Sequence, residues 1–172
     1  MKIVDGKKIT QQQANILFLE ACRYQRLDKI KYAVEELGAD VNFSINKENM
    51  RGLVYICQAR NVEKHIDYLL KKGVEVNFKY GHQGYTQAAA PYFLYYVVKN
   101  LDITDSMIYL LIIKVKSELK RSESITDYLN YVPTVKAVGG AYQSIAQEIE
   151  ANRPDLYKWL INEKILSNKN VR

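Results

Sequence analysis

The sequence predicts an all-α solenoid, a single domain over 1–172 made of about four degenerate helix–turn–helix units. Two observations lead to this fold class. A segment of about 25 residues recurs with its apolar positions in the same order. Within each copy these positions are spaced by three and four residues, as on one face of a helix. Such a helix pair cannot bury its apolar face alone, so at least three units must stack to form a stable core.

The repeat relates 18–43 to 54–78. The matching positions are Phe18 and Val54, Ala21 and Cys57, and Ile30 and Ile66, each 36 residues apart, and then Gly38 and Gly73, and Asn42 and Asn77, each 35 apart. The first copy therefore holds one extra residue before Gly38. A glycine at the end of a helix suits a left-handed turn, so Gly38 and Gly73 are predicted to have positive φ.

After each second helix the copies read Gly38-Ala39-Asp40-Val41-Asn42 and Gly73-Val74-Glu75-Val76-Asn77. These residues resemble the signature that ends the repeat of about 33 residues in the ankyrin family. The resemblance is strongest over 16–78 and implies a stack of helix pairs that binds proteins through a concave groove and projecting hairpins. The family's Thr-Pro-Leu-His opening is replaced at 16–19 and 53–55, so both first helices are expected to lack the usual cap.

The units are placed at about 12–45, 50–80, 88–120 and 141–167. In the third unit, Tyr92, Phe93, Tyr96 and Val97 are expected to supply the first helix and 107–113 the second. Asn100 is expected in the turn between these two helices, at a position where the ankyrin family usually has a glycine. In the fourth unit, Pro154 is predicted to open the second helix, at a position that tolerates a missing amide.

Three segments are expected to lie outside the helix pairs. The stretch 122–140, with its proline and its pair of glycines, is predicted to be an irregular insertion. The polar residues 11–13 and 167–172 are predicted to cover the two ends of the stack.

The sequence lacks the clustered groups that catalysis or metal binding requires. The two histidines, His65 and His82, lie in separate predicted elements, and no Cys-x-x-Cys motif occurs. Cys22 and Cys57 fall in apolar helical patterns, where a free thiol usually packs as a small hydrophobe. The eight glycines form no phosphate-binding motif. We therefore expect no enzyme activity, no catalytic residue, no cofactor and no metal.

Tyrosine is the residue type that points most directly to binding. The chain has 14 tyrosines against four phenylalanines and one tryptophan, and tyrosine offers a large amphipathic surface that is enriched at interfaces. The resemblance places the ends of the first helices at the groove and 80–85 on a projecting hairpin, although a plain loop tip is the alternative for 80–85. The predicted partner-binding residues are Arg23, Tyr24, Arg60, Tyr80, His82, Tyr85 and Lys99.

The charge of the chain leaves room for a second class of partner. A formal charge of +6 comes from 25 basic and 19 acidic residues, without a dominant basic block. The one local basic run, at 114–121, is typical of a solvated helix end. A basic accessory protein that contacts nucleic acid or a nucleoprotein is therefore the alternative. A homo-oligomeric structural adaptor is the third interpretation.

The leading interpretation is a non-catalytic protein-binding module, an inhibitor or effector that acts by steric occlusion of a partner protein. Residues 1–10 lack the apolar stretch of a secretory signal, and the apolar run at 107–113 is too short to span a membrane. We expect a soluble, cytoplasmic protein without a membrane partner. Lys, Asn, Ile and Tyr make up 60 of 172 residues, which indicates the AT-rich genome of an intracellular bacterium, a phage, a protist or a large DNA virus. The ankyrin resemblance then implies a host–pathogen interaction, with the host cytosol as the location if the source is a virus or a bacterium that exports effectors.

Overall fold

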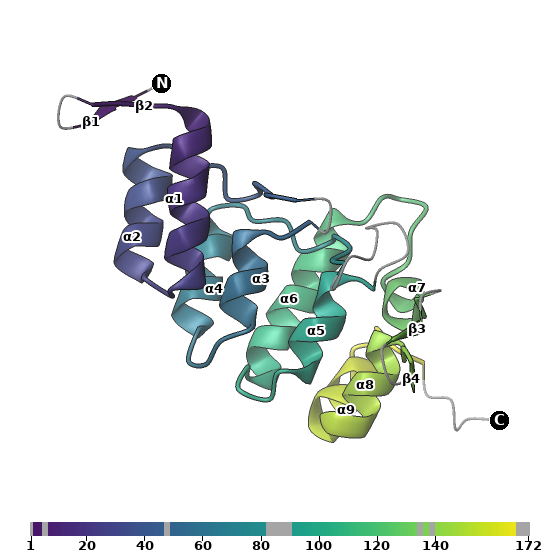
Figure 1. Ribbon diagram of the computed structural model, residues 1–172. Helices are drawn as coiled ribbons and strands as arrows, with labels where there is room; N and C mark the ends of the chain where they lie inside the picture. Colours follow the sequence, from purple (N-terminus) through teal and green to yellow (C-terminus); the bar gives the residue numbers. More distant parts are fainter. Residues whose placement is uncertain are drawn as a thin grey trace. The chain divides into compact units, whose positions relative to one another are not determined.

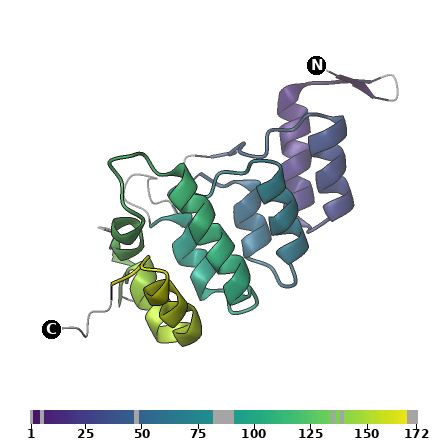
Figure 2. The same ribbon diagram turned by 180° about the vertical axis from the view of Figure 1, so that it is seen from behind.

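The computed structural model describes residues 2–4, 7–46, 49–81, 91–133, 136–137 and 140–167. Helix dominates these residues, and their strands form only two short hairpins (Figure 1; Figure 2 shows the same ribbon from behind). The prediction of an all-α chain is thereby confirmed, whereas the repeat solenoid stays a prediction. The chain divides into two compact units, Met1–Glu75 and Val76–Arg172.

The first unit consists of a β-hairpin followed by two helix pairs. Its elements are β1 (Lys2–Val4) and β2 (Lys7–Ile9), which pair antiparallel, then α1 (Gln11–Arg23), α2 (Leu27–Lys31), the π-helix η1 (Tyr32–Glu36), α3 (Gly52–Cys57) and α4 (Glu63–Lys71). α2 continues directly into η1. α1 packs against α2 and η1 and also against α3, which packs against α4.

Helix α1 begins earlier than predicted. Residues 11–13, expected to precede the helix as polar cover, form its first turn. The Thr10 hydroxyl accepts a hydrogen bond from the Gln13 backbone N–H at 3.2 Å, and the Gln13 side chain accepts one from the Thr10 N–H at 2.9 Å. This reciprocal pair is a capping box. The prediction of an uncapped first helix is therefore wrong for α1, and it is confirmed for α3, where Arg51 makes no side-chain capping bond.

The extra residue of the first copy lies in a π turn. At the end of η1, the Leu37 N–H donates to the Tyr32 carbonyl, five residues earlier, at 3.2 Å. A π turn takes up one additional residue without ending the helix. The glycines that follow the two second helices have φ of 74° at Gly38 and 81° at Gly73. The predicted positive φ at both positions is confirmed.

A glycine at the start of α3 lets α1 approach it closely. A Cβ atom at Gly52 would lie 2.6 Å from the Phe18 ring and 2.9 Å from the Cys22 Sγ, so a larger residue would push the two helices apart. Phe18 and Cys22 are fully buried. The centre of the first unit therefore lies where α1 crosses α3.

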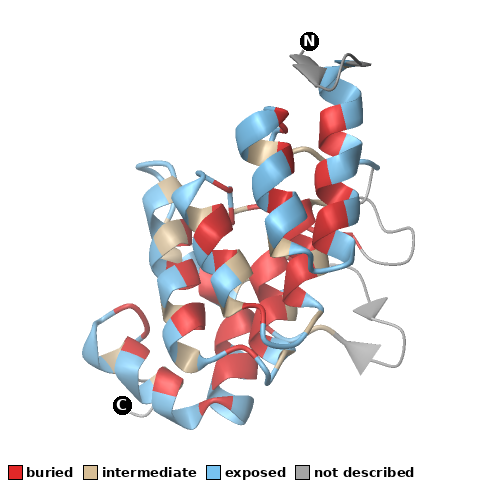
Figure 3. Ribbon diagram, turned by 90° about the vertical axis from the view of Figure 1, so that its left-hand side faces the viewer, coloured by how far each residue is buried: buried red, intermediate tan, exposed pale blue. Residues whose placement is uncertain are grey.

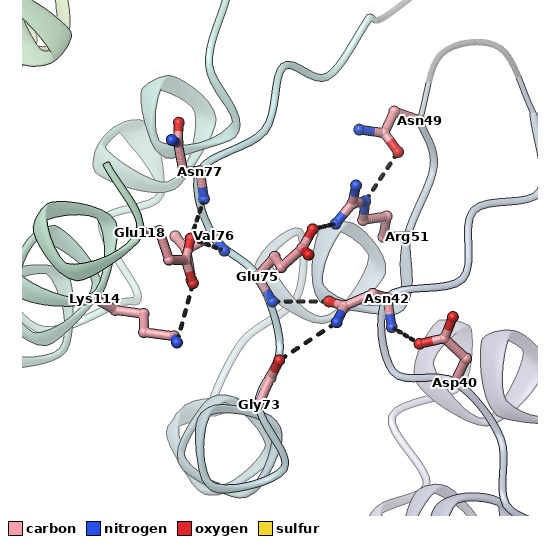
Figure 4. A network of polar contacts seen from close by, with 10 residues as sticks. All are labelled: Asp40, Asn42, Asn49, Arg51, Gly73, Glu75, Val76, Asn77, Lys114 and Glu118. Atoms are coloured by element: carbon pink, nitrogen blue, oxygen red, sulfur yellow. Dashed lines mark hydrogen bonds and ion pairs between the residues drawn. The ribbon is translucent and has the colours of Figure 1, made fainter. Parts of the chain in front are cut away.

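The signature asparagine connects the two loops of the first unit (Figure 4). Asn42 Oδ1 accepts a hydrogen bond from the Glu75 N–H at 2.8 Å, and Asn42 Nδ2 donates to the Gly73 carbonyl at 3.4 Å. Arg51 Nη1 forms an ion pair with Glu75 Oε2 at 2.9 Å. The asparagine of the first signature therefore binds the backbone of the second.

The second unit begins with the extended segment 76–80, followed by helices and one hairpin. Its elements are α5 (Phe93–Lys99), α6 (Asp105–Glu118), α7 (Ile125–Asn130), α8 (Ile145–Asn152) and α9 (Pro154–Asn162), with β3 (Lys136–Ala137) paired antiparallel to β4 (Gly140–Ala141). α8 packs against α5, α7 and α9, and α5 packs against α6. Pro154 is the first residue of α9, as predicted.

The stretch 122–140, predicted to be irregular, contains helix α7. The Ser124 hydroxyl accepts a hydrogen bond from the Thr126 N–H at 3.1 Å and so caps the helix. Tyr128 and Leu129 turn into the core of the second unit. The prediction is therefore wrong for 125–130, because a short capped helix with two buried residues gives too little periodic signal to stand out.

An arginine satisfies the end of α5 in place of a glycine turn. Asn100 has φ −83° and ψ 100°, which is not the left-handed conformation of a helix-ending glycine. The buried Arg153 side chain donates from Nε to the Val98 carbonyl at 2.9 Å and from Nη2 to the Asn100 carbonyl at 2.6 Å. Its Nη1 also contacts Asp105 at 2.6 Å. The guanidinium thereby donates to two carbonyls at the helix end, where carbonyls lack partners within the helix.

A carboxylate fixes the extended segment at the start of the second unit (Figure 4). Glu118 Oε2 accepts hydrogen bonds from the Val76 N–H at 2.9 Å and the Asn77 N–H at 2.7 Å. Glu118 Oε1 lies 3.1 Å from Lys114 Nζ. The residue at the end of α6 therefore holds the segment that precedes α5.

Candidate protein-binding cleft

A cleft of about 420 Å³ lies between α1 and the continuous α2–η1 helix of the first unit. Its lining residues are Leu17, Glu20, Ala21 and Tyr24 from α1 and its cap, and Arg26, Lys29, Tyr32 and Ala33 from α2, η1 and the turn before them. The α1 residues are three and four positions apart and so share one face of the helix. Figure 3 shows exposed residues alternating with buried ones along these helices.

The cleft has a floor of small residues and walls of large apolar ones. Ala21 and Ala33 are buried at the floor. Around them, Leu17 is 43% exposed, Tyr24 69% and Tyr32 41%. Because alanine side chains end close to the helix backbone, they leave a hollow between the larger side chains. A bulky apolar group can therefore enter the cleft and contact three large side chains at once.

The rim of the cleft carries more basic than acidic groups. Arg26 and Lys29 are exposed on the α2 side, and Glu20 is exposed on the α1 side. The Arg26 guanidinium lies 3.4 Å from the Asp28 carboxylate, and its hydrogen bond lowers the pKa of Asp28. Arg23, at the end of α1, lies 5.9 Å from the centre of the Tyr24 ring. These cations surround the apolar walls and favour a partner with carboxylates next to its apolar residues.

The structure brings together only part of the predicted partner-binding set. Tyr24 lines the cleft and is exposed. Arg23 is also exposed and lies beside the Tyr24 ring, but it does not line the cleft itself. Arg60 is exposed in the loop after α3 of the same unit but does not line the cleft. Lys99 lies in the second unit, where Nζ is 3.4 Å from Glu148 Oε1 and 5.0 Å from the centre of the Tyr95 ring.

The predicted projecting hairpin is wrong at Tyr80. This side chain is only 2% exposed, and its ring meets the Tyr96 ring edge-on with centroids 5.2 Å apart. The backbone on either side of this residue is paired, since Lys79 forms an antiparallel bridge with Tyr92 and the Tyr80 N–H donates to the Pro91 carbonyl at 3.1 Å. His82 and Tyr85, the other two residues of the predicted hairpin, lie outside the described residues.

Sequence reasoning missed Leu17, Lys29 and Tyr32 as cleft residues. A signal for Leu17 was present, because 17, 21 and 24 form a second apolar stripe on α1, beside the stripe that contains Phe18. A tyrosine among the charged residues of 27–36 was the corresponding signal for Tyr32. The ankyrin resemblance implies binding residues at helix ends and hairpins, and not on this face of α1.

The cysteines and the described histidine are part of the packing. Cys22 and Cys57 are free and buried, as predicted, and burial raises the pKa of both thiols. His65 Nε2 lies 3.1 Å from the Gln25 carbonyl. Among the described residues, no group of three His, Cys, Asp or Glu side chains could hold a metal ion. In the same part of the chain, no helix combines the length and apolar character needed to cross a membrane.

Comparison with known proteins assigns no family to the chain. No protein-family model matches the sequence, and no curated protein matches it.

Proposed function

We propose that the chain is a non-catalytic protein-binding module whose cleft between α1 and α2–η1 receives apolar side chains of a partner protein. The observation that supports this most is the exposure of Leu17, Tyr24 and Tyr32 around a floor of alanines. Single exposed apolar side chains are ordinary on protein surfaces, but a group of them around a hollow is typical of an interaction site.

The cleft would supply both affinity and selectivity. Covering a large apolar side chain contributes about 1.5 to 3 kcal/mol, and tyrosine is among the residues that dominate interface energetics. Arg23, Arg26 and Lys29 at the rim favour an acidic partner surface and speed its association. The module would act as an inhibitor or effector by covering part of its partner, in the cytoplasm of its own or a host cell.

A matched pair of charge substitutions tests the proposal. Tagged wild-type protein, Leu17→Glu and Leu110→Glu are used to capture proteins from a cytoplasmic extract of the source organism or its host. Leu17 is 43% exposed on α1 and Leu110 is 52% exposed on α6, so the two changes place the same charge on helical leucines of similar exposure. We expect wild type and Leu110→Glu to capture the same protein and Leu17→Glu to lose it, while all three unfold at similar temperatures. Equal capture by Leu17→Glu would contradict the proposal.

The other two interpretations are tested with the same preparations. Nucleic-acid binding would weaken steeply with salt and would depend on the exposed Lys116, whereas Lys114 is already paired with Glu118. Filter binding of wild type and of Lys114→Ala with Lys116→Ala across a salt series separates this class from protein binding. Light scattering of the purified chain measures its molar mass in solution. A mass well above that of one chain would favour the homo-oligomeric adaptor.

A further inference from the structure

A second hollow, of about 290 Å³, lies beside α7 in the second unit, and its walls combine aromatic rings with carboxylates. Tyr92, Tyr128 and Tyr131 supply the rings, and Glu123 and Asp127 supply the carboxylates. The volume lies just below the range of about 300 to 1,000 Å³ that is typical of sites for drug-sized ligands. The hollow therefore suits a headgroup or a single side chain.

The three rings form a continuous aromatic wall. The centroids of Tyr92 and Tyr128 are 4.1 Å apart with the rings tilted by 36°, and those of Tyr92 and Tyr131 are 5.1 Å apart with the rings at 71°. The Tyr128 side chain is 4% exposed, and its hydroxyl has no hydrogen-bond partner among the described residues. Tyr128 is therefore held in this wall by ring packing and not by its hydroxyl.

An internal cation already contacts this wall. Lys79 Nζ lies 4.3 Å from the centroid of Tyr131 and 5.3 Å from that of Tyr92, and it donates a hydrogen bond to the Tyr131 hydroxyl at 2.9 Å. These distances are within the range of cation–π attraction. The rings of Tyr92 and Tyr131 thus already accept one cation, and Lys79 itself is not part of the lining of the hollow.

The lining favours positive charge as well. It holds the carboxylates of Glu123 and Asp127 and no basic side chain. Asp127 is exposed, whereas Glu123 also accepts a hydrogen bond from the Lys120 N–H at 2.8 Å. A cation entering the hollow would therefore meet both tyrosine rings and carboxylates.

We propose that this hollow binds an organic ammonium group, either a free small amine or the ammonium of a partner's lysine or methylated lysine. Aromatic faces attract a cation through the ring quadrupole, and alkyl groups on the nitrogen add apolar contact with the rings. The site is independent of the cleft in the first unit, so either proposal can fail without the other.

The test compares choline with its neutral isostere, in which a carbon atom replaces the charged nitrogen, by NMR titration of the tyrosine ring signals at constant ionic strength. We expect saturable shifts with choline and much weaker binding of the isostere, since the two ligands differ in charge and hardly in shape. Equal binding of both, or binding of neither, would overturn the proposal. A lysine-containing peptide, with and without methylation, then shows whether free amine or side chain binds more tightly.

Three variants locate the bound cation. Tyr92→Leu and Asp127→Asn should each weaken choline binding at least about threefold, and the exposed Asp127 can be changed without disturbing the core. Lys79→Met should tighten binding, because it removes a like charge from the same rings. Tyr109→Leu is the control, because Tyr109 stacks on Trp159 outside the hollow. Unchanged affinity in Asp127→Asn and Lys79→Met would place the ammonium elsewhere and overturn the assignment.

Discussion

The two units hold the segments that follow their signature glycines with different chemistry, although the same Val-Asn sequence occurs in both. In the first unit, the Asn42 side chain binds the backbone of Gly73 and Glu75. In the second unit, Asn77 contributes its backbone N–H, and the acceptor is the Glu118 carboxylate at the end of α6 (Figure 4). A neutral amide does in one unit what a carboxylate does in the other, and both side chains are half-buried.

This difference teaches that a repeated signature can recur in the sequence while its local hydrogen bonds and its partners both change: the Phe43 N–H donates to the Asp40 carbonyl, whereas the matching Phe78 N–H donates to the Val76 carbonyl. The side chain of Asn42 binds the backbone of the next signature, at Gly73 and Glu75. Glu118 lies 41 residues from Asn77 and belongs to no recurring pattern. The stability of the second unit should therefore depend more on single, unrepeated side chains.

The largest expected effect separates two tyrosines that were predicted to play the same part. Tyr80→Ala should lower the free energy of unfolding by about 3 kcal/mol or more, because it removes a buried ring from the second unit. Tyr24→Ala should change it by about 0.5 kcal/mol or less, because Tyr24 is 69% exposed. Urea denaturation of both variants measures the difference. Similar unfolding energies would mean that the environment assigned to Tyr80 is incorrect.

The next effect concerns the carboxylate of the second unit. Glu118→Ala should cost about 2 to 3 kcal/mol, because hydrogen bonds to a charged group are strong and their loss leaves the Val76 and Asn77 N–H groups without an acceptor. Glu118→Gln keeps an acceptor oxygen and should cost less. Thermal unfolding of both variants tests this order, and a Gln variant as unstable as the Ala variant would contradict the role given to these hydrogen bonds.

A smaller effect is expected at the glycine that ends α4. Gly73 has φ of 81°, and a Cβ atom there would meet no atom within 4 Å. Any loss of stability in Gly73→Val must then come from backbone strain, of about 1 to 2 kcal/mol. Gly73→Asn should cost less, since asparagine tolerates this conformation better. A valine variant that melts like wild type would show that this turn is not left-handed.

The smallest effect is expected at the half-buried amide of the first unit, Asn42. Asn42→Ala should cost about 1 kcal/mol, because water can replace part of its hydrogen bonding. Asn42→Asp should keep the acceptor for the Glu75 N–H and lose the donor to Gly73. Chemical denaturation of Asn42→Ala beside Glu118→Ala checks the comparison directly, and a larger loss for Asn42→Ala would reverse it.

Local patterns made part of the fold predictable. Gly38 and Gly73 follow apolar helical stripes, and Pro154 can be tolerated in a helix only near its start, so all three positions could be assigned from neighbouring residues. Thr10 and Gln13 form a capping box that is visible in the sequence. The capping box was not predicted, because residues 11–13 were expected to precede the first helix.

Long-range contacts were not predictable in the same way. The burial of Tyr80 depends on the return of the chain at Tyr92, and the role of Arg153 depends on carbonyls about 55 residues earlier in the chain. The cleft exists because Phe18 faces α3, which leaves the adjacent Leu17 exposed on another face of α1. Helical spacing alone allows either assignment, and the packing of Gly52 against Phe18 decides between them.

The most direct test of the binding module is hydrogen exchange of the chain with and without its purified partner. The proposal predicts added protection over 16–33, in α1, α2 and the turn between them, and no change in α6. A Leu17→Glu protein should show neither the binding nor the protection. Protection confined to the second unit, with 16–33 exchanging as in the free chain, would contradict the assignment of the cleft as the binding surface.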